Sequence, residues 1–322
     1  MERKTCLITG ATGFIGSHLA RALVDAGAEV HAIVRPSSSL ERIADVSDRM
    51  VLHRADLDDR AAIAACMRAA APEQVFHLAA ETRRNAGTNF ASARRSILEY
   101  QIRLLNLVEA LAQAPVPPAV LVRAGTLAEY GSSPTPSAEH QREAPGSPYA
   151  AGIAAGTHYL GMLADLLPFP VVTARLALVY GPRQAESFFI PAAIRACLEG
   201  REVVVDRPDD RRDLVHVADV VDALQRLAAA APPGATILNV ASGEAPRTAE
   251  LAIMIAEETR CDPSLIRHCT ARPGSTAREL LCATAQMNAL TGWRPTTPLR
   301  EGLAATVRAI RTSLPVRAGA TS

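Results

Sequence analysis

The feature that most constrains the fold is a glycine-rich segment at residues 9–16, Thr-Gly-Ala-Thr-Gly-Phe-Ile-Gly. It follows the apolar run Thr5–Thr9 and leads into an amphipathic stretch. Gly10, Gly13 and Gly16 carry no side chain, so the backbone can turn tightly and come close to a ligand. Between a strand and a helix, such a segment offers free amides and the positive end of the helix dipole to a pyrophosphate. We therefore predict a dinucleotide site in a fold that alternates strands and helices.

The rest of the first half fits such a fold, because short apolar runs alternate with amphipathic stretches. The predicted strands are Thr5–Thr9, Glu29–Val34, Met50–Arg54, Gln74–Leu78, Ala119–Ala124 and Val171–Leu176. The predicted helices between them are Gly16–Asp25, Arg60–Ala70, Ser96–Gln113 and Tyr149–Leu166. The predicted fold class is α/β, a Rossmann-like doubly wound parallel sheet with a smaller C-terminal lobe.

The pattern changes beyond about residue 178. Shorter helices are predicted there, at Pro191–Glu199, Val217–Ala230, Thr248–Thr259 and Leu299–Arg311. We predict a dinucleotide-binding domain at residues 1–177 and a substrate-binding lobe at 178–314 that is interleaved with it. The small polar residues 315–322 are expected to form a flexible tail.

Charge and composition argue against several classes of protein. The formal net charge is +1 with both signs mixed along the chain, which disfavours nucleic-acid and membrane-surface partners. Six scattered cysteines form no Cys-x-x-Cys pair, so neither a metal site nor a disulfide framework is predicted. No secretory apolar region follows the N-terminus, and no later stretch is apolar enough to span a bilayer. We expect a cytoplasmic protein that acts on a small molecule.

Predicted cofactor contacts gather where the first four strands end. NAD-selective sites often carry an acid after the second strand, but this chain has Arg35 followed by Pro36 and serines. An arginine there can hold a 2′-phosphate, which favours NADP(H) and leaves NAD(H) as the alternative. The residues after the third strand could meet the adenine, and those after the fourth could pass under the cofactor. The full predicted set is Gly10, Thr12, Gly13, Phe14, Ile15, Gly16, Arg35, Asp56, Leu57, Leu78, Ala79 and Ala80.

Eight segments in order along nearly the whole chain carry a family resemblance. They are TGATGFIG, HLAA, GTLAEYG, SPYAA, RLALVYGP, RRDLVHVADVVDA, NVASGE and GWRPTTPLREGL. The chain resembles an extended short-chain dehydrogenase/reductase of the NAD-dependent epimerase/dehydratase kind. This resemblance implies a nucleotide-sugar substrate and a homodimer. Two helices per subunit would form the dimer, here Ser96–Gln113 and Tyr149–Leu166.

The resemblance also implies catalytic and substrate residues. Thr126 falls at the family's active-site Ser/Thr, and Tyr149 falls at its catalytic tyrosine, which also contacts the cofactor. Hydride chemistry at a C=O needs a hydroxyl that polarises the carbonyl and a phenol that transfers a proton. Arg212 and Arg272 match family contacts to the substrate diphosphate. Glu129 lies next to these motifs and could relay protons, although such charges more often face solvent or cap a helix.

The chain departs from the family pattern at its catalytic centre. Ile153 stands where relatives have a lysine that holds the nicotinamide ribose and lowers the tyrosine pKa, and the only lysine in the chain is Lys4. Tyr100 stands where many relatives have an asparagine. Dehydratase relatives carry an Asp-Glu pair after the Ser/Thr, but here Leu127 and Ala128 follow it, which argues against sugar 4,6-dehydration.

The missing lysine bears on the direction of the reaction. An unperturbed tyrosine is ionised in about one molecule in a thousand at pH 7, so its use as a base costs about 4 kcal/mol more. Reduction of a carbonyl requires Tyr149 only to donate a proton. We therefore expect NADP(H)-dependent reduction of a keto group on an NDP-4-keto-deoxysugar, with Thr126 polarising the carbonyl. One alternative is a redox-neutral isomerase, epimerase, lyase or cyclase. A second is a non-catalytic dinucleotide-binding protein.

Overall fold

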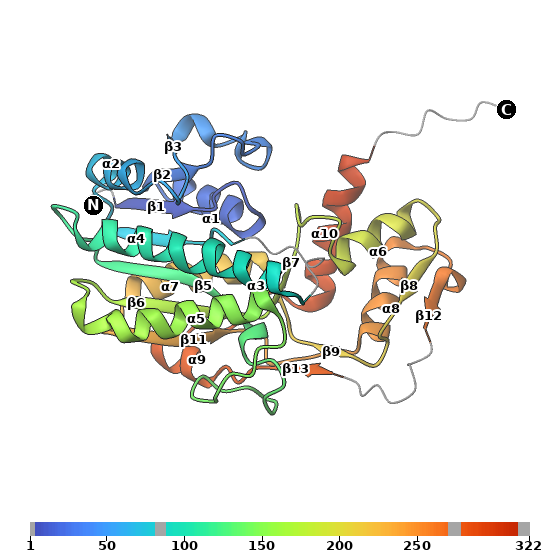
Figure 1. Cartoon of the computed structure of the whole chain (residues 1–322). Helices are drawn as coiled ribbons and strands as arrows, with labels where there is room; N and C mark the ends of the chain where they lie inside the picture. Colours follow the sequence, from blue (N-terminus) through green and yellow to red (C-terminus); the bar gives the residue numbers. More distant parts are fainter. Residues whose placement is uncertain (1–3, 81–87, 270–277, 315–322) are drawn as a thin grey trace.

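The computed structural model describes residues 4–80, 88–269 and 278–314 (Figure 1). Its centre is a seven-stranded parallel sheet in the order β11-β6-β5-β4-β1-β2-β3. The first six of these strands in chain order are β1 (Thr5–Thr9), β2 (Glu29–Val34), β3 (Val51–Arg54), β4 (Gln74–His77), β5 (Val120–Thr126) and β6 (Val171–Leu176). Helices flank the sheet on both faces, so the predicted Rossmann-like α/β fold is confirmed.

The seventh strand, β11 (Ala235–Val240), was not predicted. It pairs with β6 from Ala235 opposite Val171 to Val240 opposite Leu176, at the edge of the sheet. Its sequence is one short apolar run far along the chain, which periodicity alone does not assign to a particular sheet. The second half of the chain thus completes the sheet built by the first half, whereas the domain boundary at residue 177 stays a prediction.

Alternate residues of each strand enter two different cores. Ile8 of β1 and Val122 of β5 pack with α1 (Phe14–Asp25) and α7 (Val217–Ala230). Leu7 of β1 and Leu121 of β5 each stand one residue earlier in their strand, and they face a second core on the opposite side of the sheet. The helices that pack in this second core are α2 (Arg60–Ala70), α4 (Arg103–Ala112) and α5 (Pro148–Leu163). Because β5 lies between these two helix layers, successive side chains along it point alternately to the two faces of the sheet.

A long helical run precedes β5. It begins at α3 (Phe90–Ser96), earlier than the predicted Ser96, and continues through η3 (Ile97–Ile102) into α4. The segment η3 is a π-helix, a form that often marks functional positions. It packs against α5 and carries Tyr100, which is 9% exposed. The prediction of a helical stretch over Ser96–Gln113 is confirmed, but its start was placed six residues late and its π-helical segment was not predicted.

The second lobe contains α6 (Phe189–Leu198), α8 (Thr248–Thr259) and α10 (Leu299–Ser313) around a third core. Three pairs of short parallel strands accompany them: β7 (Leu178–Tyr180) with β10 (Leu214–His216), β8 (Val203–Val205) with β12 (Ile266–His268), and β9 (Arg211–Arg212) with β13 (Glu279–Leu280). The remaining elements are α9 (Ala285–Thr291), η1 (Glu41–Ile43), η2 (Ser47–Arg49), η4 (Leu127–Glu129), η5 (Ala164–Leu166) and η6 (Pro263–Leu265). Within the described residues, no helix has the length and apolar character needed to cross a membrane. The predicted tail at 315–322 lies outside the described residues.

Candidate active site

The strand order reverses between β1 and β4, which creates a crevice at their carboxyl ends. The backbone of the glycine-rich segment crosses this crevice. Gly10 has φ +80°, and a Cβ there would lie 2.7 Å from the carbonyl carbon of Leu78. A Cβ at Gly16 would overlap the carbonyl oxygen of Gly10. Only glycine fits these two positions without movement of the backbone.

Helix α1 opens towards the same crevice. Gly13 is its N-cap, no side chain caps it, and its first turn carries no acid. The first-turn amides and the positive helix end are therefore presented to an anion. Thr12, Phe14 and Ile15 surround this end and are half-buried. Gly10, Gly13 and Gly16 leave a space at this helix end, here called the glycine cradle. It fits the pyrophosphate of a dinucleotide.

Other predicted cofactor residues lie along the same edge of the sheet. Arg35 directly follows β2 and is exposed, and Ala79 and Ala80 follow β4. Asp56 and Leu57 follow β3 and are anchored to α4: Asn106 Nδ2 donates to the Leu57 carbonyl oxygen at 2.9 Å, and Arg103 Nε lies 3.8 Å from Asp56 Oδ1. The structure thus brings the predicted set to one edge, and the role of each residue stays a prediction.

Thr126 ends β5 and caps the short helix η4. Its Oγ1 accepts a hydrogen bond from Ala128 N at 3.2 Å, while Thr126 N donates to Glu129 Oε1 at 2.8 Å. The accepted bond uses an oxygen lone pair, so the hydroxyl proton can still be donated to a carbonyl. Capping and polarisation of a substrate are compatible at this residue.

Tyr149 lies in the first turn of α5. Ser147 is the N-cap, with Ala150 N donating to its Oγ at 3.2 Å, and proline occupies the next position. The Tyr149 ring meets the Tyr100 ring edge to face, with ring centroids 5.8 Å apart. A Cβ at Gly152 would lie 2.6 Å from Tyr100 Cδ2, so this glycine allows η3 to approach α5. Tyr100 and Tyr149 therefore form one aromatic wall.

A small cavity of about 10 Å³ lies beside this wall, room for about one water molecule. It connects the strand end expected under the cofactor to the position of the missing lysine. Its lining includes Leu78, Ala79, Ala80, Tyr100, Arg123 and Ile153. Ile153 is 3% exposed and presents an apolar side chain at the position where the family resemblance implies a lysine.

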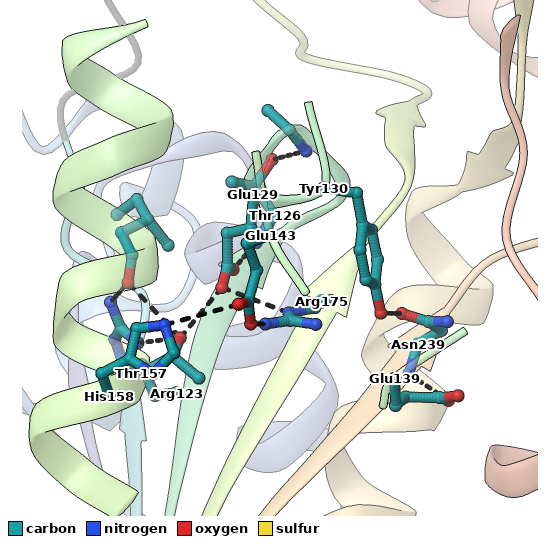
Figure 2. A network of polar contacts seen from close by, with 12 residues as sticks. Arg123, Thr126, Glu129, Tyr130, Glu139, Glu143, Thr157, His158, Arg175 and Asn239 are labelled. Atoms are coloured by element: carbon teal, nitrogen blue, oxygen red, sulfur yellow. Dashed lines mark hydrogen bonds and ion pairs between the residues drawn. The ribbon is translucent and has the colours of Figure 1, made fainter. Parts of the chain in front are cut away.

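Arg123, which lines this cavity, begins a chain of buried charges (Figure 2). Arg123 Nη1 donates to Thr157 Oγ1 at 3.0 Å, and Thr157 Oγ1 donates to Glu129 Oε2 at 3.0 Å. Arg175 Nε donates to the same Glu129 oxygen at 3.2 Å, and its Nη2 pairs with Glu143. Burial is the largest single effect on the pKa of Arg175 and lowers it, but Glu129, Tyr130 and Glu143 together raise the pKa above its usual value, so Arg175 stays charged.

Positive and negative groups alternate along this chain, and it ends near the surface. His158 Nε2 lies 3.4 Å from Glu143 Oε2, and the His158 side chain is 69% exposed. The side chains of Glu129 and Arg175 are both fully buried. Glu129 is therefore neither a solvated charge nor only a cap, because it compensates a buried arginine.

A second polar cluster fixes the loop between β5 and α5. Tyr130 OH donates to Asn239 Oδ1 at 2.8 Å, and Asn239 N donates to Glu139 Oε1 at 3.0 Å. Asn239 Nδ2 also donates to the Ser137 carbonyl oxygen at 3.0 Å. Arg175 stacks over the Tyr130 ring, 4.5 Å from its centroid. The unpredicted strand β11, which carries Asn239, thus holds the loop that leads to Tyr149.

The two predicted substrate arginines differ in what the structure describes. Arg212 lies on β9, where its Nη1 donates to the carbonyl oxygens of Arg211 at 2.9 Å and Arg278 at 2.8 Å. Its Nη2 pairs with Asp210. Arg272 lies outside the described residues. Contact of either arginine with a diphosphate stays a prediction.

Arg123, Glu143 and Asn239 were missed by sequence reasoning. One signal was present for Arg123, since a charged residue inside the apolar strand run at residues 119–124 must be buried or must interrupt the strand. No local signal marks Glu143 or Asn239. Their partners lie 32 and 109 residues away in the sequence.

Comparison with known proteins places these features in context. A model described as the NAD dependent epimerase/dehydratase family matches residues 6–241. A UDP-glucose 4-epimerase of Mycolicibacterium smegmatis is 34% identical over 320 residues, covering 95% of this chain and 98% of that protein. The structure of a Thermotoga maritima UDP-glucose 4-epimerase with UDP-glucose has a TM-score of 0.84 at 26% identity, covering 96% of this chain and 99% of the other. A Thermus thermophilus UDP-glucose 4-epimerase complex with NAD has a TM-score of 0.80 at 29% identity and the same coverage.

Proposed function

The chain belongs to the NAD dependent epimerase/dehydratase family of nucleotide-sugar-modifying enzymes, and we propose that it reduces a keto group of a nucleotide sugar. The observation that carries this proposal is the packing of β5, which ends at Thr126, against α5, which holds Tyr149. Both elements lie at the edge of the sheet that carries the glycine cradle. This packing supports the proposal that hydroxyl groups from two elements flank the hydride-transfer position.

Each residue has a defined task in this proposal. The glycine cradle holds the cofactor pyrophosphate, and the bound nicotinamide supplies the hydride. Thr126 donates a hydrogen bond to the substrate carbonyl oxygen, and Tyr149 gives its proton to that oxygen as the carbonyl is reduced. The lysine position is apolar Ile153, and an unperturbed tyrosine is protonated at neutral pH, so reduction requires less of Tyr149 than oxidation does. An NDP-4-keto-deoxysugar is the proposed substrate.

Substrate-dependent oxidation of NADPH or NADH tests this function. The Tyr149→Phe variant should lose about 100-fold or more in turnover, the lower range for loss of a general acid. Tyr159→Phe is the matched control, because Tyr159 lies on the same helix and is 44% exposed. Equal activity of the Tyr149→Phe variant and the wild type would contradict the assignment. Cofactor binding without any Tyr149-dependent turnover would favour the non-catalytic alternative.

Epimerisation at the sugar C4 is the second candidate. Its support is the similarity to UDP-glucose 4-epimerases over nearly the whole chain. It asks Tyr149 to accept a proton in one half-reaction and to return it in the other. Interconversion of UDP-glucose and UDP-galactose with no net change in cofactor absorbance would distinguish this activity from reduction.

The proposal about cofactor preference, NADP(H) over NAD(H), depends on Arg35. The family is NAD dependent, and we propose a preference for NADP(H) within this chain because an exposed arginine follows β2. A titration of nicotinamide fluorescence with NADPH and NADH measures the preference. Arg35→Asp should weaken NADPH binding and leave NADH binding similar, whereas Arg68→Asp on α2 should change neither. Equal NADPH binding by the wild type and Arg35→Asp would refute the preference.

A homodimer is the proposed assembly. Large apolar side chains on η3, α5 and η5 are exposed although these segments are neighbours in the fold. We define this apolar helix face by Ile97, Leu98, Ile102, Tyr159, Met162 and Leu166, which are 43–74% exposed. Large exposed apolar side chains gathered on neighbouring elements are typical of protein interfaces. A second copy of the chain, packing the same helices, would cover it.

A further inference from the structure

Arg123 is a buried arginine in the middle of β5. Its residue is 2% exposed, and it points to the face covered by α4 and α5. Its Nη2 donates to the carbonyl oxygen of Ile153 at 2.8 Å, and its Nη1 donates to Thr157 Oγ1 at 3.0 Å. The guanidinium thus contacts the main chain of the residue that stands at the family's lysine position.

Space for this guanidinium comes from a glycine on α5. A Cβ at Gly156 would lie 2.5 Å from Arg123 Nη2 and 3.0 Å from its Cζ. Arg123 also lines the small cavity together with Leu78, Ala79 and Ala80, the residues expected under the cofactor. The guanidinium therefore lies between the segment after β4, which is expected under the cofactor, and the first turns of α5.

The charge of Arg123 has no direct carboxylate partner within 4.0 Å in the part of the chain that the structure describes. Glu129 reaches it through the Thr157 hydroxyl. Burial lowers the pKa of Arg123 to about 10, while negative charge on Glu129 and on Tyr149 opposes this shift. A buried cation in this situation favours negative charge on a neighbouring group.

The other groups around Arg123 limit which neighbour takes that charge. His77 on β4 lies opposite Arg123 in the strand register. Burial, and to a lesser extent the charge of Arg123, lowers the pKa of His77 to about 3, so His77 stays neutral. Arg175 on β6 is a second cation, already paired with Glu129. Two phenols remain: Tyr100, which lines the same cavity, and Tyr149, whose negative charge raises the pKa of Arg123.

We propose that Arg123 is a positioning residue that replaces the charge of the missing lysine and stabilises the anionic form of Tyr149. The proposal rests on the proposed proton transfer by Tyr149. When Tyr149 gives its proton to the substrate oxygen, the remaining tyrosinate is balanced by the guanidinium until water returns a proton. The same charge makes Tyr149 a usable base, so Ile153 does not close the oxidising direction.

A titration without substrate or cofactor tests the charge coupling directly. The ultraviolet absorbance of tyrosinate is followed against pH in the wild type and in Tyr149→Phe, and the difference is the Tyr149 contribution. In Arg123→Met this contribution should move to higher pH by about 1 to 2 units, the usual effect of removing a nearby opposite charge. Arg123→Lys keeps the charge and should retain most of the wild-type position. Gly156→Ala, which displaces the guanidinium, should shift it in the same direction as Arg123→Met.

Turnover provides the second readout. Arg123→Met should lower kcat about 10-fold or more with the alkaline limb of its pH profile displaced, and Arg123→Lys should restore both. Adding Ile153→Lys to Arg123→Met should recover activity, because a charge returns to the family's position. A purely structural role for Arg123 predicts no recovery in that double variant.

The outcomes separate this proposal from the proposed function. An unchanged Tyr149 titration in both Arg123→Met and Gly156→Ala overturns the role of Arg123, whatever the enzyme turns over. A shifted titration in a protein that turns over no nucleotide sugar supports the coupling and refutes the reaction instead. If Arg123→Met does not fold, the Gly156→Ala titration alone decides.

Discussion

Glu129 compensates a buried arginine, and its neutralisation should weaken both the fold and the site. The Glu129→Gln variant keeps the size of the side chain and removes its charge. Glu129 Oε1 accepts from Thr126 N at 2.8 Å, and Oε2 accepts from Arg175 Nε at 3.2 Å and Thr157 Oγ1 at 3.0 Å. Among the described residues, Arg175 would then keep only Glu143 as an ion-pair partner.

The size of the effect follows from burial. Both side chains of the Glu129–Arg175 pair are fully buried, and removal of one partner from such a pair costs about 3 to 5 kcal/mol. The unfolding entropy of a chain of 322 residues is about 0.7 kcal/mol per degree at the usual value per residue. The melting temperature should therefore fall by about 4 to 7 °C.

Thermal unfolding followed by circular dichroism measures this change. Glu109→Gln is the matched control, because Glu109 pairs with Arg60 at 2.5 Å but the two side chains are 40% and 66% exposed. Exposed pairs contribute about 1 kcal/mol or less, so this variant should melt within about 1.5 °C of the wild type. Equal melting temperatures for the two variants would refute the charge-compensating role of Glu129.

Three further outcomes are expected. Gly10→Ala should abolish measurable dinucleotide binding in the fluorescence titration, because φ is +80° and the new Cβ would lie 2.7 Å from the Leu78 backbone; unchanged affinity would exclude the glycine segment as the phosphate cradle. His77 has a folded pKa of about 3 against 6.5 in the unfolded chain, so its contribution to stability is present above pH 6.5 and is lost as pH falls towards 3. Between pH 7 and pH 5 the wild type should therefore lose about 2 kcal/mol more than His77→Asn in urea unfolding, and parallel losses would contradict this. Met162→Glu, at a position 62% exposed on the apolar helix face, should convert a dimer to a monomer in sedimentation, and a monomeric wild type would refute the assembly.

Local features carried most of the fold prediction. Strands β1, β2 and β6 were predicted to the residue, because apolar runs bounded by turn residues are a local property. The glycine cradle was equally readable, since backbone conformation and close approach restrict those positions to glycine. The positions of Thr126 and Tyr149 came from motif order along the chain. The missing lysine at Ile153 was visible in the sequence, but its consequence was not.

The sequence by itself determined the alternation of strands and helices, the cradle and the absence of a lysine from α5, because each depends on neighbouring residues. Only the tertiary structure decided which buried charges meet. Arg123, Glu129 and Arg175 come from β5, η4 and β6, and β11 joins the sheet from more than 50 residues beyond β6. Such contacts depend on how strands are ordered and on which face each side chain lies, and local periodicity does not specify strand order. The guanidinium beneath α5 became apparent only when these elements were placed together.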